Sequence, residues 1–185
     1  QNNKWGLFPS LSVGWTLSEE SFLKGNPTVN NLKFRLNYGQ TGNSEGIAPY
    51  RSLALVGASN KYYDNGNWLP TYKPSQNPNP DLKWEVNENY GAGIDFALWN
   101  YRITGSLDYY IRNTKDLLYE IAAPLSIKPL YPTILANVGS MRNQGLELSL
   151  NAGIIDKGDF RYDVTFAGAT LNNEVTSLAD RKSVV

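Results

Sequence analysis

The sequence predicts an all-β fold, an antiparallel up-and-down sheet that forms part of a transmembrane β-barrel. Three observations lead to this prediction. Apolar and polar residues alternate in six segments, which is the period of a strand whose two faces meet different environments. The connections between these segments differ sharply in length. No run of residues approaches the ~18–20 apolar residues that a transmembrane helix needs.

The six alternating segments are expected to be the strands of this sheet. In the stretch GIDFAL, for example, Ile94, Phe96 and Leu98 fall on one face, and small or charged residues fall on the other. The segments comprise residues 7–17, 32–40, 84–98, 101–113, 144–155 and 160–167. Each of them therefore combines an apolar face with a face that is polar or small.

The connections place short turns at one end of the sheet and long loops at the other. About two residues separate the third segment from the fourth, and about five separate the fifth from the sixth. The stretch 40–83 is rich in Gly, Asn, Pro and Tyr, and the stretch 119–140 holds three prolines. Because outer-membrane barrels have short periplasmic turns and long external loops, we expect both stretches to be extracellular loops.

The composition excludes several classes of function. The 185 residues carry a net charge of zero and a mean hydropathy of −0.41, so there is no basic surface for nucleic acid. Cysteine and histidine are both absent, which excludes a disulfide framework, thiolate metal sites, the usual zinc ligand and a Ser-His-Asp triad. Asp64 with Asp81, or Glu85 with Glu88, could form a glycosidase pair, but no spacing marks either pair. We therefore expect no enzyme activity, no cofactor and no metal.

The alternation by itself leaves two folds open. A secreted, soluble β-sandwich that binds carbohydrate would bury the apolar face in a core, whereas a barrel would turn that face to lipid. Three features favour the barrel. Some runs span about 10–13 residues, against about 5–6 for ordinary strands. Tyr101 and Tyr109 lie about 26 Å apart along one apolar face, and the polar face of 87–97 is unusually small.

Six strands are too few to close a lipid-facing barrel, which needs eight or more. An open sheet would leave unpaired strand edges in hydrocarbon. We therefore expect the chain to be a fragment of a larger barrel, with residues 172–185 trailing out of the sixth strand into another outer loop.

Charged residues are expected to have local partners. Glu88 falls on the apolar face, but near the long-loop end, where an interfacial charge is tolerated. On the polar face we expect ion pairing within the sheet, although pairing with a domain inside the barrel is the alternative. The charges concerned are Lys33, Arg35, Asp95, Arg102, Asp108, Glu147, Arg161 and Asp163.

The loop 40–83 carries the candidate substrate-binding residues. Aromatic rings beside Asn and Asp suit sugars, which offer apolar C–H faces and many hydroxyls. The candidates are Tyr50, Tyr62, Tyr63, Trp68 and Tyr72. The same rings could instead pack the loop on itself or contact a lid protein, and all three interpretations stay open.

The loop 119–140 is apolar for a loop, and exposed apolar loops tend to dock on other surfaces. We expect this one to dock on neighbouring loops within the mouth of the barrel, and docking on another protein is the alternative. Its apolar residues are Ile121, Leu125, Ile127, Leu130, Tyr131 and Ile134.

Six strings of the sequence occur in the order found in one known family. They are NNKWGLFPSLSVGWTLSEESFLK (2–24), LKFRLNYGQTGN (32–43), NPDLKWE (79–85), LDYYIRNTKDLL (107–118), NVGSMRNQGLELSLNAGII (137–155) and NNEVTSL (172–178). With these strings the chain resembles the C-terminal part of the barrel in SusC/RagA-type TonB-linked outer-membrane transporters of Bacteroidetes. Only the loop around 44–78 lies outside the resemblance.

The resemblance implies that residues 1–185 are part of a 22-stranded barrel with an N-terminal plug, surrounded by outer-membrane lipid in a Gram-negative cell. It also implies import of glycans or peptides, powered through TonB, with a SusD-like surface lipoprotein over the outer face. The plug, the TonB box, a signal peptide and the terminal strands have no counterpart in these residues, so those properties belong to a parent chain. Substrate-contacting residues vary in the family, and none transfers by motif.

Overall fold

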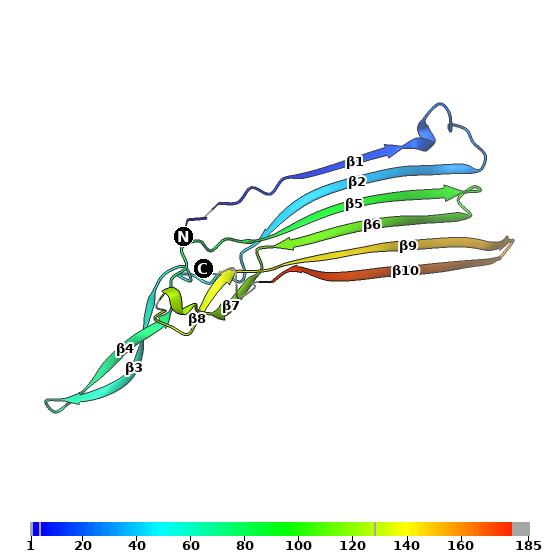
Figure 1. Cartoon of the computed structure of the whole chain (residues 1–185). Helices are drawn as coiled ribbons and strands as arrows, with labels where there is room; N and C mark the ends of the chain where they lie inside the picture. Colours follow the sequence, from blue (N-terminus) through cyan, green and yellow to red (C-terminus); the bar gives the residue numbers. More distant parts are fainter. Residues whose placement is uncertain (1, 4, 128, 179–185) are drawn as a thin grey trace.

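The chain folds into one large antiparallel sheet. A computed structural model describes residues 2–3, 5–127 and 129–178. Residues 172–185 were expected to lead from the sixth strand into another outer loop, but the last strand continues through Ser177, and residues 179–185 lie outside the described residues. The sheet contains, in spatial order, β1 (Ser10–Thr16), β2 (Val29–Asn43), β5 (Glu85–Leu98), β6 (Ile103–Lys115), β9 (Ser140–Lys157) and β10 (Phe160–Ser177). Spatial order follows chain order, which confirms the six-stranded up-and-down meander (Figure 1).

The two segments expected as long loops are partly regular. The first contains a hairpin of β3 (Leu55–Asp64) and β4 (Asn67–Gln76), and it begins only after β2 has continued through Asn43. The second contains a short hairpin of β7 (Leu118–Ala122) and β8 (Thr133–Asn137), with a 3-10 turn, η2 (Leu125–Ile127), between them. Both hairpins extend from the same end of the sheet, and β3–β4 projects well beyond it (Figure 1).

The other end of the sheet carries three connections without strands. The first includes a 3-10 turn, η1 (Leu17–Glu19), and the other two link β5 to β6 and β9 to β10 (Figure 1). The expected separation of short connections and long loops is therefore confirmed.

The turn between β5 and β6 is longer than expected and has an unusual backbone. Trp99, Asn100 and Tyr101 have φ values of 51°, 54° and 62°, in the left-handed region that non-glycine residues seldom occupy. The Asn30 side chain holds this turn, because its Oδ1 accepts the N–H groups of Asn100 (2.6 Å) and Tyr101 (3.3 Å). The prediction that Tyr101 and Tyr109 lie along one strand is therefore wrong, because Tyr101 lies in the turn and β6 begins at Ile103.

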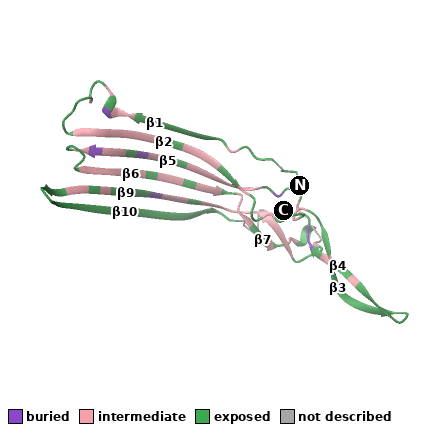
Figure 2. Ribbon diagram, turned by 180° about the vertical axis from the view of Figure 1, so that it is seen from behind, coloured by how far each residue is buried: buried purple, intermediate pink, exposed green. Residues whose placement is uncertain are grey.

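The sheet has no packed core on either face. Among the described residues, only Leu82 and Ala97 are buried hydrophobic side chains, and the strands are coloured mostly as intermediate or exposed (Figure 2). A β-sandwich buries the inner faces of two sheets against each other. Here the six long strands form a single sheet, so the structure does not support the sandwich alternative.

Side chains of paired strands line up in rows across the sheet, because directly opposed residues point to the same face. One row on the apolar face runs through Trp15, Phe34, Ile94, Leu107 and Leu148. No helix among the described residues is long and apolar enough to cross a membrane.

A polar row bounds the apolar face on the side of the hairpins. It consists of Gln40, Glu88, Asn113, Arg142 and Glu174. Between this row and the turns, the apolar face of β5 runs from Leu98 to Tyr90, about 26 Å at ~3.3 Å per residue. Strands tilted by about 40° would give this stretch a height of about 20 Å, close to the ~25 Å apolar band of an outer-membrane barrel.

The boundary of the apolar face slants across the sheet. On β9 and β10, Gln144 and Asn172 are polar one row nearer the turns, opposite Ile111 of β6, and on β10 Thr170 is polar one row nearer still. At the turn end of the same two strands, apolar residues continue through Ile155 and Phe160. A slanting boundary is what tilted strands produce where they cross a flat apolar layer.

Candidate functional site

The polar face of the sheet is organised around Arg35 on β2. Its guanidinium donates two hydrogen bonds to Asp95 on β5, from Nε to Oδ2 (2.7 Å) and from Nη2 to Oδ1 (2.8 Å). Nη2 also lies 2.8 Å from Asp108 Oδ1 on β6. One cation thus joins carboxylates on two further strands. The fork geometry of arginine suits this arrangement.

Gly93 makes that reach across β5 possible. A Cβ atom at this position would lie 2.2 Å from Asp108 Oδ1 and 2.9 Å from Arg35 Nη2. Gly91 plays the same part for Asn37, whose Oδ1 would lie 2.0 Å from an added Cβ. The small residues on this face are therefore explained within the sheet, because long polar side chains of the neighbouring strands occupy the space above them.

The other charges on the polar face are only partly paired. Arg161 and Asp163 form an ion pair at 2.7 Å, and Arg102 Nη2 donates to the Ile154 carbonyl at 3.3 Å. Lys33 and Glu147 have no ion pair within the part of the chain that the structure describes. The expected pairing within the sheet is confirmed for the clusters at Arg35 and Arg161 and leaves Lys33 and Glu147 available to other partners.

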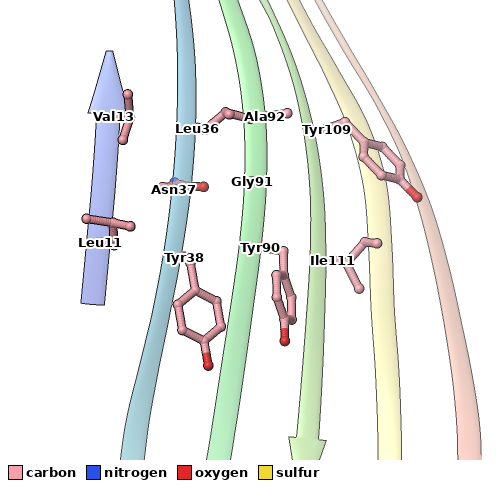
Figure 3. A pocket seen from close by; sticks show the side chains of 10 residues that line it. All are labelled: Leu11, Val13, Leu36, Asn37, Tyr38, Tyr90, Gly91, Ala92, Tyr109 and Ile111. Carbon is pink, nitrogen blue, oxygen red and sulfur yellow. The ribbon is translucent and has the colours of Figure 1, made fainter. Parts of the chain in front are cut away.

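The apolar face carries a shallow groove of about 420 Å³. Its floor is at Ala92 on β5, and the larger side chains of the neighbouring strands surround it (Figure 3). The rings of Tyr38 and Tyr90 lie side by side, with centroids 5.0 Å apart. Their hydroxyls point toward the C-terminal end of β6, which is the hairpin end of the sheet (Figure 3). A groove of this kind suits hydrocarbon, with the phenol groups turned to a polar boundary.

Glu88 has its charge neutralised at that boundary. Its carboxylate lies 2.8 Å from Lys115 Nζ and accepts a hydrogen bond from Gln40 Nε2 at 3.2 Å. The side chain is only 13% exposed, and burial of a charge requires such partners. Glu88 therefore lies at the edge of the apolar face, as expected.

The structure places three of the five candidate substrate-binding residues on one face of the β3–β4 hairpin, two of them in contact. Tyr63 on β3 and Trp68 on β4 are directly paired, and their ring centroids are 5.3 Å apart. Tyr72 lies four residues beyond Trp68 on β4, so it belongs to the same face of the strand. Tyr62 is paired with Leu69 on the opposite face, and Tyr50 lies before the hairpin. We call Tyr63, Trp68 and Tyr72 the aromatic stripe.

These rings are not packed into the loop. The five candidates have exposed fractions between 50% for Tyr62 and 71% for Tyr50. The interpretation in which they pack the loop on itself is therefore not supported by the structure. Apart from the contact between Tyr63 and Trp68, the rings stay open to surroundings outside the described residues.

The two outer segments dock on each other, but mainly through polar contacts. Asn79 Nδ2 donates to the Leu135 carbonyl of β8 at 2.9 Å. Asn137 Nδ2 donates to the carbonyls of Lys83 (2.7 Å) and Asp116 (2.8 Å). Docking between neighbouring loops was expected from apolar residues, yet Leu125 and Leu130 stay 88% and 63% exposed. The side chain of Ile127 lies outside the described residues.

Sequence reasoning missed these amides. Asn79 lies in the string QNPNPDLK (76–83), where asparagines between prolines look like ordinary loop composition, and Asn137 begins the string NVGS (137–140). The only signal was local: Asn side chains are well suited to bond backbone groups in turns. Pairing across more than fifty residues could not be read from that.

The carboxylate pairs considered for catalysis are not assembled. Glu85 accepts hydrogen bonds from the Leu118 N–H (2.9 Å) and from Asn43 Nδ2 (3.1 Å), while Glu88 binds Lys115 on the other face of β5. Asp81 Oδ1 accepts a hydrogen bond from Asn2 Nδ2 at 2.8 Å. Asp64 is the last residue of β3, at the tip of the hairpin. Across the described ranges, no group of three or more Asp and Glu could hold a metal ion.

Comparison with known proteins gives consistent matches. The family profile described as "TonB dependent receptor-like, beta-barrel" matches residues 1–183. The TonB-dependent receptor SusC of Bacteroides thetaiotaomicron is 38% identical over 183 residues, which is 96% of this chain and 18% of SusC. A TonB-dependent receptor of Formosa agariphila is 37% identical over 180 residues, covering 97% of this chain and 17% of that protein.

Solved structures agree with these sequence matches. The RagAB peptide transporter superposes with a TM-score of 0.80 at 29% identity, over 96% of this chain and 19% of that one. The RagAB peptide importer in its "open-open" state gives a TM-score of 0.85 at the same identity and coverage. The chain thus spans less than a fifth of the length of these relatives, and the sheet corresponds to one section of a larger barrel wall.

Proposed function

We propose that this chain, which belongs to the TonB-dependent receptor-like β-barrel family, forms one section of the wall and outer mouth of an outer-membrane nutrient importer. One observation carries the proposal. The six-stranded sheet has an apolar face of membrane height and a charged, hydrogen-bonded opposite face, and neither face is covered by a core. Such a sheet is stable in a bilayer only as part of a closed barrel, where every strand edge is paired.

Each face then has its own role in import. The apolar face and the tyrosines at its edge contact lipid, while the face with Arg35, Asp95 and Asp108 lines the lumen. Lys33 and Glu147 are free to contact whatever fills the lumen. The hairpins β3–β4 and β7–β8 extend outside the cell and form part of the entrance.

The parent protein imports glycans or peptides and works with a SusD-like lipoprotein over the outer face. The SusC and RagAB relatives support this proposal. Energy reaches the parent through TonB, by way of segments other than these strands. The wall itself catalyses no reaction.

Substrate contact at the entrance is assigned to the aromatic stripe. Tyr63 and Trp68 present neighbouring ring faces, and Tyr72 extends them along β4. Exposed rings in a row suit the apolar faces of successive sugars, with Asn and Asp near the tip to bond hydroxyls. Tyr62 and Tyr50 lie off the stripe, so we place them at the margin of this contact.

A cysteine scan of β5 tests the placement of the wall in a membrane. The chain contains no cysteine, so single substitutions give clean signals in a parent protein otherwise free of cysteine. In bilayers, Ala92→Cys and Ile94→Cys should resist a water-soluble maleimide, whereas Asn89→Cys and Asp95→Cys should react. As a matched readout, a fluorophore is attached at each position and its quenching by brominated lipid is measured. Quenching should be strong at positions 92 and 94 and weak at positions 89 and 95. Equal reactivity at all four positions would contradict a membrane wall.

A further inference from the structure

Asn77 joins the two outer segments with an unusually complete set of hydrogen bonds. It follows directly after β4 and is only 5% exposed. Its Nδ2 donates to the carbonyls of Tyr131 (2.5 Å) and Thr133 (2.8 Å). Its Oδ1 accepts the N–H groups of Leu130 (2.9 Å) and Tyr131 (3.0 Å). Both amide protons and both oxygen lone pairs are therefore used, which is the full capacity of the side chain.

All four partners of Asn77 are backbone groups of the segment that leads into β8. A contact of this kind fixes the path of the second segment whatever its side chains are. The preceding residue, Gln76, acts in the other direction, since its Nε2 donates to the carbonyls of Tyr50 (2.9 Å) and Leu53 (2.6 Å). The foot of the β3–β4 hairpin is thus tied on one side to its own entry and on the other side to its neighbour.

The hairpin depends on its foot for its position. An isolated two-stranded hairpin is marginally stable in water, and β3–β4 projects away from the sheet (Figure 1). β4 contains ten residues, so it is about 33 Å long at ~3.3 Å per residue, and a rotation of about 10° at the foot moves the tip by about 6 Å. A contact at the foot therefore decides where the rings at the tip lie.

We propose that Asn77 is a positioning residue that locks the β3–β4 hairpin to the β7–β8 segment, so that the aromatic stripe and the exposed Leu125 and Leu130 move as one rigid outer arm. The consequence for substrate or partner contact rests on the proposed function, but the linkage itself does not. One body then carries two exposed surfaces, and neither surface can shift without the other.

The linkage can be measured as a distance distribution between spin labels in the full-length parent protein. One label replaces Lys61 near the hairpin tip, and the other replaces Ser126 in η2. In the parent sequence we expect a narrow distribution. Asn77→Ala removes all four hydrogen bonds and should at least double the width of the distance distribution. Asn67→Ala is the matched control, because this exposed asparagine at the tip donates only to the Asn65 carbonyl at 3.5 Å, and it should leave the width unchanged.

A second pair of spin labels, the reference pair, replaces Lys24 and Asp159 at the turn end of the sheet. The distance between these two labels reports whether the barrel is intact. If Asn77→Ala broadens the reference pair as well, Asn77→Asp decides the question. It keeps the acceptor oxygen but replaces the two donated bonds by repulsion between a carboxylate oxygen and the carbonyls of Tyr131 and Thr133. Asn77→Asp should then broaden the arm pair but not the reference pair. An arm width that neither variant changes, or that Asn67→Ala changes equally, would overturn the proposal. No substrate is needed, so a receptor that fails to import but keeps the narrow distribution contradicts the proposed function alone.

Discussion

The sheet and the outer arm are built in contrasting ways. In the sheet, β5, β6 and β9 are each bonded along most of their length to a strand on either side, and β9 and β10 pair over 17 positions. The β3–β4 hairpin has only its own two strands and a foot held by a few side chains, namely the amides of Gln76 and Asn77 and the guanidinium of Arg51, which bonds Gln76 and pairs with Glu120. In the sheet, position is specified by many repeated contacts, whereas in the arm it depends on single residues.

The difference extends to what each region needs from its surroundings. The sheet exposes a continuous apolar face, so its stability requires lipid and the rest of a barrel. The hairpin exposes individual aromatic rings but keeps charged and polar residues between them, so it tolerates water. The sheet therefore depends on lipid and neighbouring strands for its stability, whereas the hairpin depends on the contacts at its foot for its position.

The largest expected effect follows from removing the environment of the sheet. Residues 1–185 expressed alone should aggregate in buffer and show no cooperative thermal unfolding, since only Leu82 and Ala97 form a buried apolar core among the described residues. Detergent, or the rest of the parent chain, should restore strand signal in circular dichroism. A soluble monomer with a sharp unfolding transition would instead support the sandwich fold and remove the contrast between the two regions.

Glycine substitutions in the sheet should give the next largest effect. A Cβ at Gly145 would lie 2.3 Å from the Thr170 carbonyl oxygen, which is backbone, whereas at Gly93 it meets flexible side-chain ends. Gly145→Ala should therefore destabilise the parent barrel by about 2–3 kcal/mol through overpacking, and Gly93→Ala by about 1 kcal/mol through loss of the Arg35–Asp108 contact. Urea unfolding followed by tryptophan fluorescence compares them, and equal losses would contradict the backbone clash.

Much of the sheet could be predicted from the sequence, because alternation of apolar and polar residues directly records which way side chains point. The six strands and their order followed from it, and so did the position of Glu88 at the apolar edge. The turn at Trp99 did not follow, because the left-handed backbone there depends on Asn30, which lies some seventy residues earlier.

The outer arm could be predicted only in part. The aromatic residues were recognised, but their division between two faces of a hairpin required the register of Tyr63 with Trp68 and of Tyr62 with Leu69. Asn77 was missed because a fully bonded asparagine looks like any other loop asparagine in the sequence. Periodicity is a repeated signal, whereas a linkage between two loops leaves no repeat to detect.

In the arm, Trp68→Ala should weaken binding of a glycan, one of the two proposed substrate classes, by about tenfold, or ~1.4 kcal/mol, because it removes a ring of the aromatic stripe that contacts Tyr63. Leu69→Ala is the matched control on the opposite face of β4. It should leave the dissociation constant within about twofold. Isothermal titration with the full-length receptor measures both variants. If the two losses are equal, both faces of the hairpin are covered on binding, which points to a protein partner that encloses it rather than to a sugar on one face.

The smallest effect is expected where the sheet has its most conspicuous ion pairs. Arg35→Ala removes the bidentate contact to Asp95 and the contact to Asp108, yet all three side chains are about one-third exposed. Water can solvate the two carboxylates that remain, so the free energy of unfolding should fall by about 1 kcal/mol or less, and by still less in high salt. Urea unfolding of the parent barrel at two salt concentrations measures this change. A loss of several kcal/mol would mean that a single residue specifies the sheet as strongly as Asn77 is proposed to specify the arm, and the contrast between the two regions would then not hold.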